Sequence, residues 1–172
     1  APSFQDGLIY SLAYDIESDR IIVSGRNNIG DIIFKAYDYN TDTWTDLTGT
    51  GWEDCSDMAY DIENDRIIAG GDVNDFKAYD YNTDTWTQLT SPETNFFGDC
   101  AMAYDVKNKR IFIDKESGVD NSPILAYDYD TDTWTELNGP GFEWGRKYMT
   151  YHFESDKIIM KGYLDSEFSA YD

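Results

Sequence analysis

The string Ala36-Tyr37-Asp38-Tyr39-Asn40-Thr41-Asp42-Thr43-Trp44-Thr45-Asp46-Leu47 returns almost unchanged at residues 78–89 and 126–137. A fourth copy begins with Ala-Tyr-Asp at Ala170. Repeats that recur about every 45 residues are typical of arrays of small sheet units. The 172 residues are therefore expected to form one domain built of repeats.

Each repeat is expected to form four short strands. Alignment on Ala13, Ala59, Ala103 and Thr150 gives units at about 9–48, 56–90, 100–138 and 148–172. Runs of β-branched and aromatic residues alternate with Asn, Asp and Thr turns, and no segment holds a helical apolar period. The expected fold is all-β: a β-propeller of about four four-stranded blades in a single domain, 1–172, whose last blade lacks its outer strand.

The repeat also resembles a known family. The pattern Tyr-Asp, Arg-Ile-Ile, Gly-Gly, then Ala-Tyr-Asp-Tyr-Asn-Thr-Asp-Thr-Trp-Thr is similar to kelch-type β-propeller repeats over the whole chain. The glycine pair of that family survives only at Gly70-Gly71. The other units have Ser24-Gly25, Asp114-Lys115 and Lys161-Gly162 at this place.

The fourth unit stops at Asp172, before its outer strand. Residues 1–7 contain Pro2 and Gly7 and are a poor replacement for that strand. Three interpretations stay open. The ring has four blades with one of three strands, the four blades belong to a larger ring, or a partner adds a strand to the Ala170–Asp172 edge, which would permit self-assembly.

Composition excludes some partners. A net charge of −21 repels nucleic acid and anionic membranes. It favours cations, basic proteins or neutral ligands such as sugars. No stretch approaches the ~18 apolar residues of a membrane span. The start, Ala1-Pro2-Ser3, is that of a processed secreted chain or of a partial chain, and an extracellular or cell-surface location is expected.

The turns of the repeat are rich in carboxylates, which would cap their own backbones and pair with Arg20, Arg66 and Arg110. The alternative is calcium binding, since three turns copy the first half of a calcium loop without its glycine or bidentate glutamate. The candidate ligands for Ca²⁺, the one cofactor considered, are Asp38, Asn40, Asp42, Asp80, Asn82, Asp84, Asp128, Asp130 and Asp132.

The variable loops at the opposite end of the blades carry aromatic residues. Such side chains are costly to expose and indicate either a contact with a ligand or the filling of space between blades. Aromatic rings beside Asp, Asn and Arg side chains are suited to binding a sugar or a protein. The candidate binding residues are Trp52, Phe96, Phe97, Phe142, Trp144 and Arg146.

Two further sets of residues are interpreted as structural. Trp44, Trp86 and Trp134 recur at one repeat position and are expected to pack between blades. Cys55 and Cys100 stand at the start of neighbouring inner strands, so they either form a disulfide or remain buried thiols.

Catalysis is not expected. Copper oxidases with similar repeats need two imidazoles, and this chain has a single histidine, His152, at a turn position. A Ser-His-Asp or Cys-His site would depend on this one histidine, which is expected to be a turn residue. We therefore predict a binding module that recognises a protein or glycan through its aromatic loops. The alternative is a building block of an oligomer or fibre.

Overall fold

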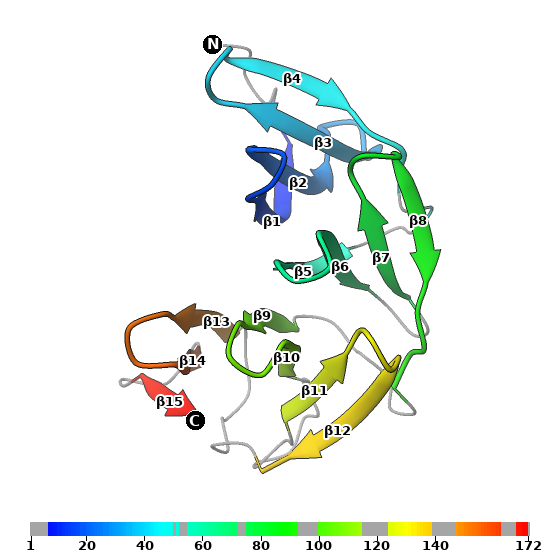
Figure 1. Ribbon diagram of the computed structural model, residues 1–172. Helices are drawn as coiled ribbons and strands as arrows, with labels where there is room; N and C mark the ends of the chain where they lie inside the picture. The colour runs from blue at the N-terminus through cyan, green and yellow to red at the C-terminus, as the bar shows by residue number, and fades with distance from the viewer. Residues whose placement is uncertain are drawn as a thin grey trace.

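The computed structural model describes residues 7–49, 51, 55–71, 75–92, 100–114, 124–138, 147–162 and 168–171. These residues form four antiparallel sheets, and none of them lies in a helix, so no membrane-spanning helix is found among them. The sheets are arranged as blades around a common axis, with the inner strands at the centre (Figure 1). The chain is a four-bladed β-propeller whose last blade has three strands.

The strands follow one another from the axis outward in every blade. Blade 1 contains β1 (Leu8–Asp15), β2 (Arg20–Arg26), β3 (Ile32–Asp38) and β4 (Thr43–Asp46), and blade 2 contains β5 (Cys55–Asp61), β6 (Arg66–Gly71), β7 (Phe76–Asp80) and β8 (Thr85–Gln88). Blade 3 contains β9 (Ala101–Asp105), β10 (Arg110–Asp114), β11 (Ile124–Asp128) and β12 (Thr133–Leu137), and blade 4 contains β13 (Lys147–His152), β14 (Lys157–Gly162) and β15 (Ser169–Tyr171).

The strand register is the same in every blade. In blade 2, Ala59, Ile68, Ala78 and Thr87 lie side by side across the sheet, and Tyr60, Ile67, Tyr79 and Trp86 form the next row. Neighbouring rows point to opposite sides of a sheet. Each blade therefore has two faces, which we call the alanine face and the tyrosine face after these rows.

The core lies between the blades. The alanine face of each blade packs on the tyrosine face of the next: Ala13, Ile22 and Phe34 of blade 1 meet Tyr79 and Trp86 of blade 2. Phe76 of blade 2 meets Tyr127 of blade 3 edge-on, with ring centroids 4.7 Å apart, and lies 4.8 Å from the Trp134 ring. The expected packing of Trp86 and Trp134 between blades is confirmed, while Trp44 stacks on Tyr37 of its own blade.

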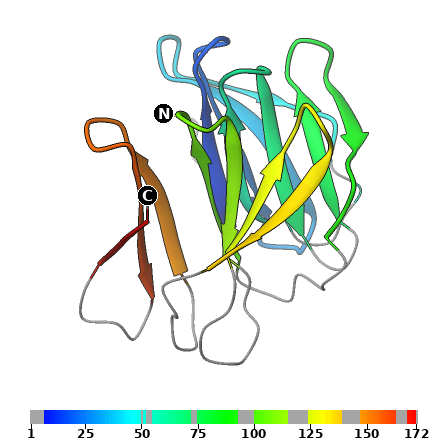
Figure 2. The ribbon, with the colours of Figure 1, turned by 60° about the horizontal axis from the view of Figure 1, so that its bottom comes forward.

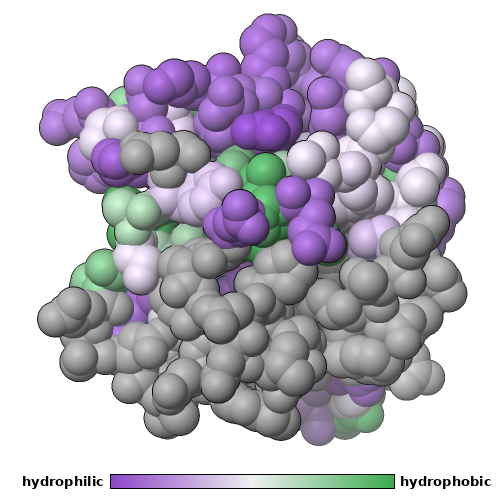
Figure 3. Space-filling view, turned by 90° about the horizontal axis from the view of Figure 1, so that it is seen from below, coloured by the Kyte–Doolittle hydropathy of each residue, from purple (hydrophilic) through white to green (hydrophobic). Residues whose placement is uncertain are grey.

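The turns between strands lie at one end of the molecule, and the strand ends that lead into the variable loops lie at the other (Figure 2). Seven turn residues have φ between 51° and 56°: Asp19, Asp42, Asp65, Asp84, Lys109, Asp132 and Asp156. Aspartate tolerates this left-handed conformation better than most residues. In side view the turn end is predominantly hydrophilic (Figure 3).

A polar contact locks neighbouring blades together at their outer strands. Asp84 accepts hydrogen bonds from the backbone N–H of Thr48 (2.8 Å) and its hydroxyl (2.9 Å), while the Trp86 indole donates to the Thr48 carbonyl (2.8 Å). Asp132, Thr90 and Trp134 repeat this contact between blades 2 and 3. The recurring Asp and Trp of the repeat thus join blades in pairs.

Replacing Asp84 by alanine is expected to destabilise the chain by about 2 kcal/mol at pH 7, because three hydrogen bonds at a partly exposed site are lost. Partial burial acts to raise the pKa of Asp84, but the bonds from Tyr79 and Thr48 outweigh it and hold the pKa below its ordinary value. This stabilisation is present above the unfolded pKa of about 3.9 and is lost as the pH falls. Urea unfolding at pH 7 and pH 3 should therefore show a smaller difference between wild type and variant at pH 3.

The matched control is Asp130→Ala, because Asp130 is an exposed carboxylate in the equivalent turn of blade 3. Its removal should change stability by less than about 0.5 kcal/mol. An Asp84 variant as stable as the Asp130 variant at pH 7 would show that the contact contributes nothing.

Candidate binding site along the propeller axis

The inner strands of all four blades line a cavity of about 970 Å³. Its wall combines aliphatic, thioether and tyrosine side chains with a few polar groups. It runs from the loop end, where Ser11, Asp57 and Cys100 line it, to the turn end, where Tyr14, Tyr60, Tyr104 and Tyr151 line it. A cavity of this size can hold a small-molecule or oligosaccharide ligand.

Asp57 is the polar centre of the loop end. One carboxylate oxygen accepts the Ser11 hydroxyl (2.6 Å) from β1 and the Met58 N–H (2.9 Å) of its own strand. The other accepts the Met102 N–H (2.7 Å) from β9. One side chain thus joins the inner strands of three blades. Burial raises the pKa of Asp57, and these three hydrogen bonds counteract the rise.

Three of the four tyrosines at the turn end hydrogen-bond to the scaffold. Tyr14, Tyr60 and Tyr151 each donate a hydroxyl hydrogen bond to the aspartate five residues later, at 2.5, 2.8 and 2.9 Å. In blade 3 this turn position is Lys109, which pairs with Glu63 of blade 2 instead. Burial and the Asp61 carboxylate raise the pKa of Tyr104. The hydroxyls of these tyrosines therefore remain protonated. Ser11 and Asp57, polar groups of the cavity that are not part of the repeated pattern, lie at the loop end.

The loop residues named from the sequence, Trp52, Phe96, Phe97, Phe142, Trp144 and Arg146, lie outside the described residues, so their role stays a prediction. The strands place the flanking segments at the loop end, because β5 begins at Cys55 and β9 at Ala101. Cys100 is buried, and its Sγ lies 3.8 Å from the place that a Cβ on Gly70 would take. The side chain of Cys55 is not among those described. The disulfide stays a prediction as well.

The calcium candidates serve the turns. Asp38 caps the backbone of Asn40 (2.9 Å) and Thr41 (3.2 Å) and lies 3.0 Å from the Arg20 guanidinium. Asp80 does the same with its own turn and with Arg66 at 3.2 Å, and Asp128 caps Thr131 at 3.1 Å.

The remaining candidates have similar roles, apart from Asp130, which is exposed. Asp42, Asp84 and Asp132 accept tyrosine hydroxyls, and the amides of Asn40 and Asn82 donate to Asp19 and Asp65. Within the described ranges no three His, Cys, Asp or Glu side chains gather as a metal site. The expected pairing of Arg20 and Arg66 with nearby carboxylates is confirmed.

Sequence reasoning missed Asp57 and Ser11. Asp57 aligns with Ser11, Ala101 and Tyr148, and the structure places it within β5. The usable signal was a carboxylate at an inner-strand position that carries no acid in the other three units.

The comparisons with known proteins concern the fold. No protein-family model matches the chain, and no curated protein sequence matches it significantly. Among solved structures, an auxiliary nutrient binding protein from Bacteroides thetaiotaomicron is 14% identical, with a TM-score of 0.73 over 98% of this chain and 39% of that one. A similar protein from Bacteroides ovatus is 15% identical, with a TM-score of 0.68 over 88% of this chain and 35% of that one.

A chain of a nidogen/laminin complex is 11% identical, with a TM-score of 0.71 over 91% of this chain and 57% of that one. This chain therefore spans between about a third and just over half of these three solved chains. At these identities the likeness concerns architecture alone, and it agrees with the blades described above. The chain is a β-propeller.

Proposed function

We propose that the chain is a non-catalytic, kelch-like binding module that works outside the cell and recognises a glycan or a protein at the loop end of its axis. The observation that carries the proposal is the cavity of about 970 Å³ with Asp57 at its loop end. A mostly apolar wall with a few fixed polar groups is typical of ligand sites. Aromatic side chains from the adjoining loops would extend this site.

Charge and the solved relatives support the same interpretation. A chain of net charge −21 favours neutral or cationic ligands over anionic ones. Two of the similar structures are described as auxiliary nutrient binding proteins, and a third belongs to a protein–protein complex of nidogen and laminin. Binding of a nutrient and association with a protein, the properties that these descriptions name, are compatible with our proposal of a glycan or protein ligand.

The choice of binding over catalysis rests on how the acid–base groups are placed and paired. His152, the one histidine, is exposed at the turn end, where its Nδ1 lies 2.9 Å from the Ser155 hydroxyl oxygen. The tyrosines and most of the turn aspartates hydrogen-bond to each other and to the backbone. Asp57 is the half-buried carboxylate of the cavity, and its hydrogen bonds hold strands together.

A glycan array, with purified protein as the probe, tests the proposal. Wild type is expected to bind a defined set of glycans, and the double variant Trp52→Ala, Trp144→Ala should lose at least tenfold in apparent affinity, because stacking surface is removed. The matched control is Tyr39→Ala, which removes an aromatic ring that is 49% exposed at the turn end and should leave binding unchanged.

If wild type binds no glycan on the array, the glycan interpretation is contradicted and the protein-ligand interpretation remains. Binding that survives in the double variant but is lost in the Tyr39 variant would place the site at the turn end and contradict the proposal itself.

A second candidate function is strand exchange at the edge of blade 4. In the described chain β15 pairs with β14 on one side only, whereas β3, β7 and β11 each pair with an outer strand as well. A partner could supply that strand by β-augmentation, which would make the chain a building block of an oligomer or fibre.

A further inference from the structure

Exposed apolar side chains are concentrated on the first and last blades. In the described ranges, Ile62 is the one exposed large apolar side chain of blades 2 and 3. All the others belong to blades 1 and 4: Leu8, Ile9, Tyr10, Leu12, Tyr14, Ile16, Ile29, Ile32, Tyr39, Tyr148, Phe153 and Phe168. Apolar patches of this kind indicate interaction surfaces.

On blade 1 the exposed surface is the tyrosine face. Leu12 is 60% exposed, whereas Met58 and Met102, at the same repeat position, are each 4% exposed. Tyr14 is 44% exposed, and its counterpart Tyr104 is 7% exposed. In blades 2, 3 and 4 this face is covered by the preceding blade.

On blade 4 the exposed surface is the alanine face. Phe168 is 71% exposed, whereas Phe34 and Phe76 at the same repeat position are 4% and 0% exposed. Ala170 is exposed as well, and its counterparts Ala36 and Ala78 are buried. In blades 1, 2 and 3 this face is covered by the following blade.

The two open faces are therefore the two halves of the interface that the chain already forms three times. The two faces do not meet within one chain, because blades 1 and 4 stand apart (Figure 1). Both blades border the cavity, with Tyr14 of β1 and Tyr148 of β13 in its wall. A second copy of this chain offers both missing halves at once.

We propose that two copies associate head to tail, with the alanine face of blade 4 in each copy packed on the tyrosine face of blade 1 in the other. Head-to-tail contacts close into a pair with two-fold symmetry when the rotation from one copy to the next is 180°, and this closed pair is the arrangement we propose. Phe168 of one copy then packs against Tyr37 and Trp44 of the other, as Phe34 packs against Tyr79 and Trp86 within the chain. Leu12, Tyr14 and Tyr148 belong both to these faces and to the cavity wall, so the assembly would also change the cavity proposed above as the ligand site.

Charge gives the association a defined salt dependence. Each copy has a net charge of −21, so the copies repel one another at low ionic strength while their apolar faces attract. Salt screens the repulsion and strengthens apolar burial. The dimer should therefore be tighter at 0.5 M NaCl than at 0.05 M NaCl.

Sedimentation velocity of the wild-type chain tests the proposal, and a concentration-dependent dimer is expected. Leu12→Asp and Phe168→Asp, each on one face, should weaken the dimer at least tenfold. Both side chains are exposed in the single chain, so the thermal unfolding of the monomer should not change. The matched control, Ile62→Asp, changes a residue that is 39% exposed outside both faces and should leave the dimer intact.

A mixing experiment separates head-to-tail association from other modes. When the Leu12→Asp and Phe168→Asp chains are mixed, a pair made of one chain of each kind retains one unaltered interface. Association should therefore partly recover in the mixture. A monomeric wild type would overturn the proposal, and so would a dimer insensitive to either variant or an open polymer. Recovery that fails in the mixture would contradict the head-to-tail arrangement. None of these outcomes depends on glycan binding.

Discussion

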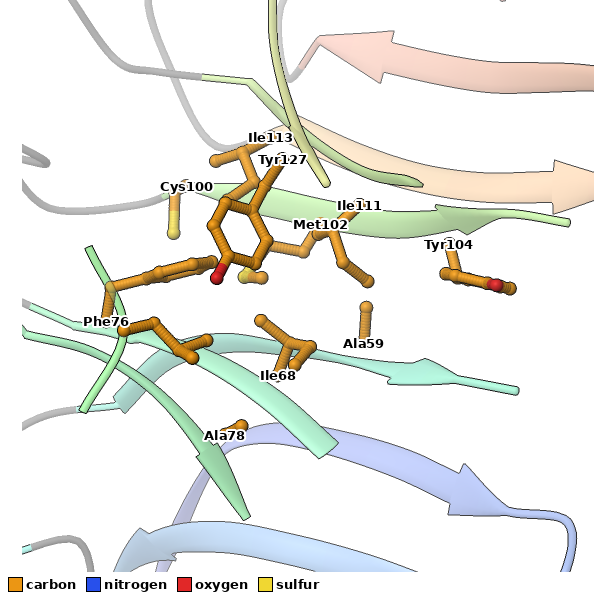
Figure 4. Packing of buried hydrophobic residues seen from close by; sticks show 11 residues of the cluster. Ala59, Ile68, Phe76, Ala78, Cys100, Met102, Tyr104, Ile111, Ile113 and Tyr127 are labelled. Atoms are coloured by element: carbon orange, nitrogen blue, oxygen red, sulfur yellow. The ribbon is translucent and has the colours of Figure 1, made fainter. Parts of the chain in front are cut away.

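Replacing Phe76 by alanine is expected to lower the free energy of unfolding by about 3–5 kcal/mol, the range found for large aromatic side chains removed from well-packed cores. Phe76 is fully buried between blades 2 and 3 and lies against the rings of Tyr127 and Trp134. Figure 4 shows its ring, from β7, pointing at Tyr127 of the next blade. A midpoint shift on the order of 10 °C should follow for a chain of this length.

The chain contains its own control for this prediction. Phe168 occupies the same repeat position but is 71% exposed, so Phe168→Ala should cost less than about 0.5 kcal/mol. Both changes should be compared in a Leu12→Asp background, so that association does not contribute. Equal losses from the two variants would show that the blade interface is not the source of stability.

Replacing Asp57 by alanine is expected to cost about 3 kcal/mol. The Ser11 hydroxyl and the N–H groups of Met58 and Met102 all donate to this carboxylate, and buried donors without partners are costly. The cost of burying the carboxylate, which raises its pKa, offsets part of the gain. Because the pKa is raised, the contribution of Asp57 is greatest below the unfolded pKa of about 3.9 and decreases as the pH rises.

Urea unfolding at pH 7 measures this loss, with two variants for comparison. Ser11→Ala removes one of the three donors and should cost about 1 kcal/mol. Asp57→Asn keeps one acceptor oxygen and should lie between wild type and Asp57→Ala. An alanine variant no less stable than Ser11→Ala would mean that Asp57 does not join the three blades.

The sequence alone predicted the blades because the repeat encodes their register. Ala13, Ala59, Ala103 and Thr150 were aligned from the sequence, and each lies at the equivalent position of an inner strand, paired with Ile22, Ile68, Phe112 and Ile159. Identical local patterns must give identical strand pairing, since a slip of one residue would expose the apolar row.

Contacts between blades could not be predicted in this way. The contact of Asp84 with Thr48, which Asp132 and Thr90 repeat, joins residues of different blades, and nothing in either segment indicates its partner. Asp57 is the one acid at its position among the four units, but its hydrogen bonds depend on how three inner strands approach the axis. The exposure of Leu12 and Phe168 follows from what lies beside the end blades, which no local sequence pattern specifies.

Hydrogen–deuterium exchange of the protein, with and without a glycan identified on the array, tests most directly whether the repeat is scaffold and the loop end of the axis is the site. We predict slower exchange on ligand binding at the start of β5 and β9, around Asp57 and Met102, and no change in the turns 15–19, 38–42 and 80–84. Protection confined to those turns, with none around Asp57, would contradict the account.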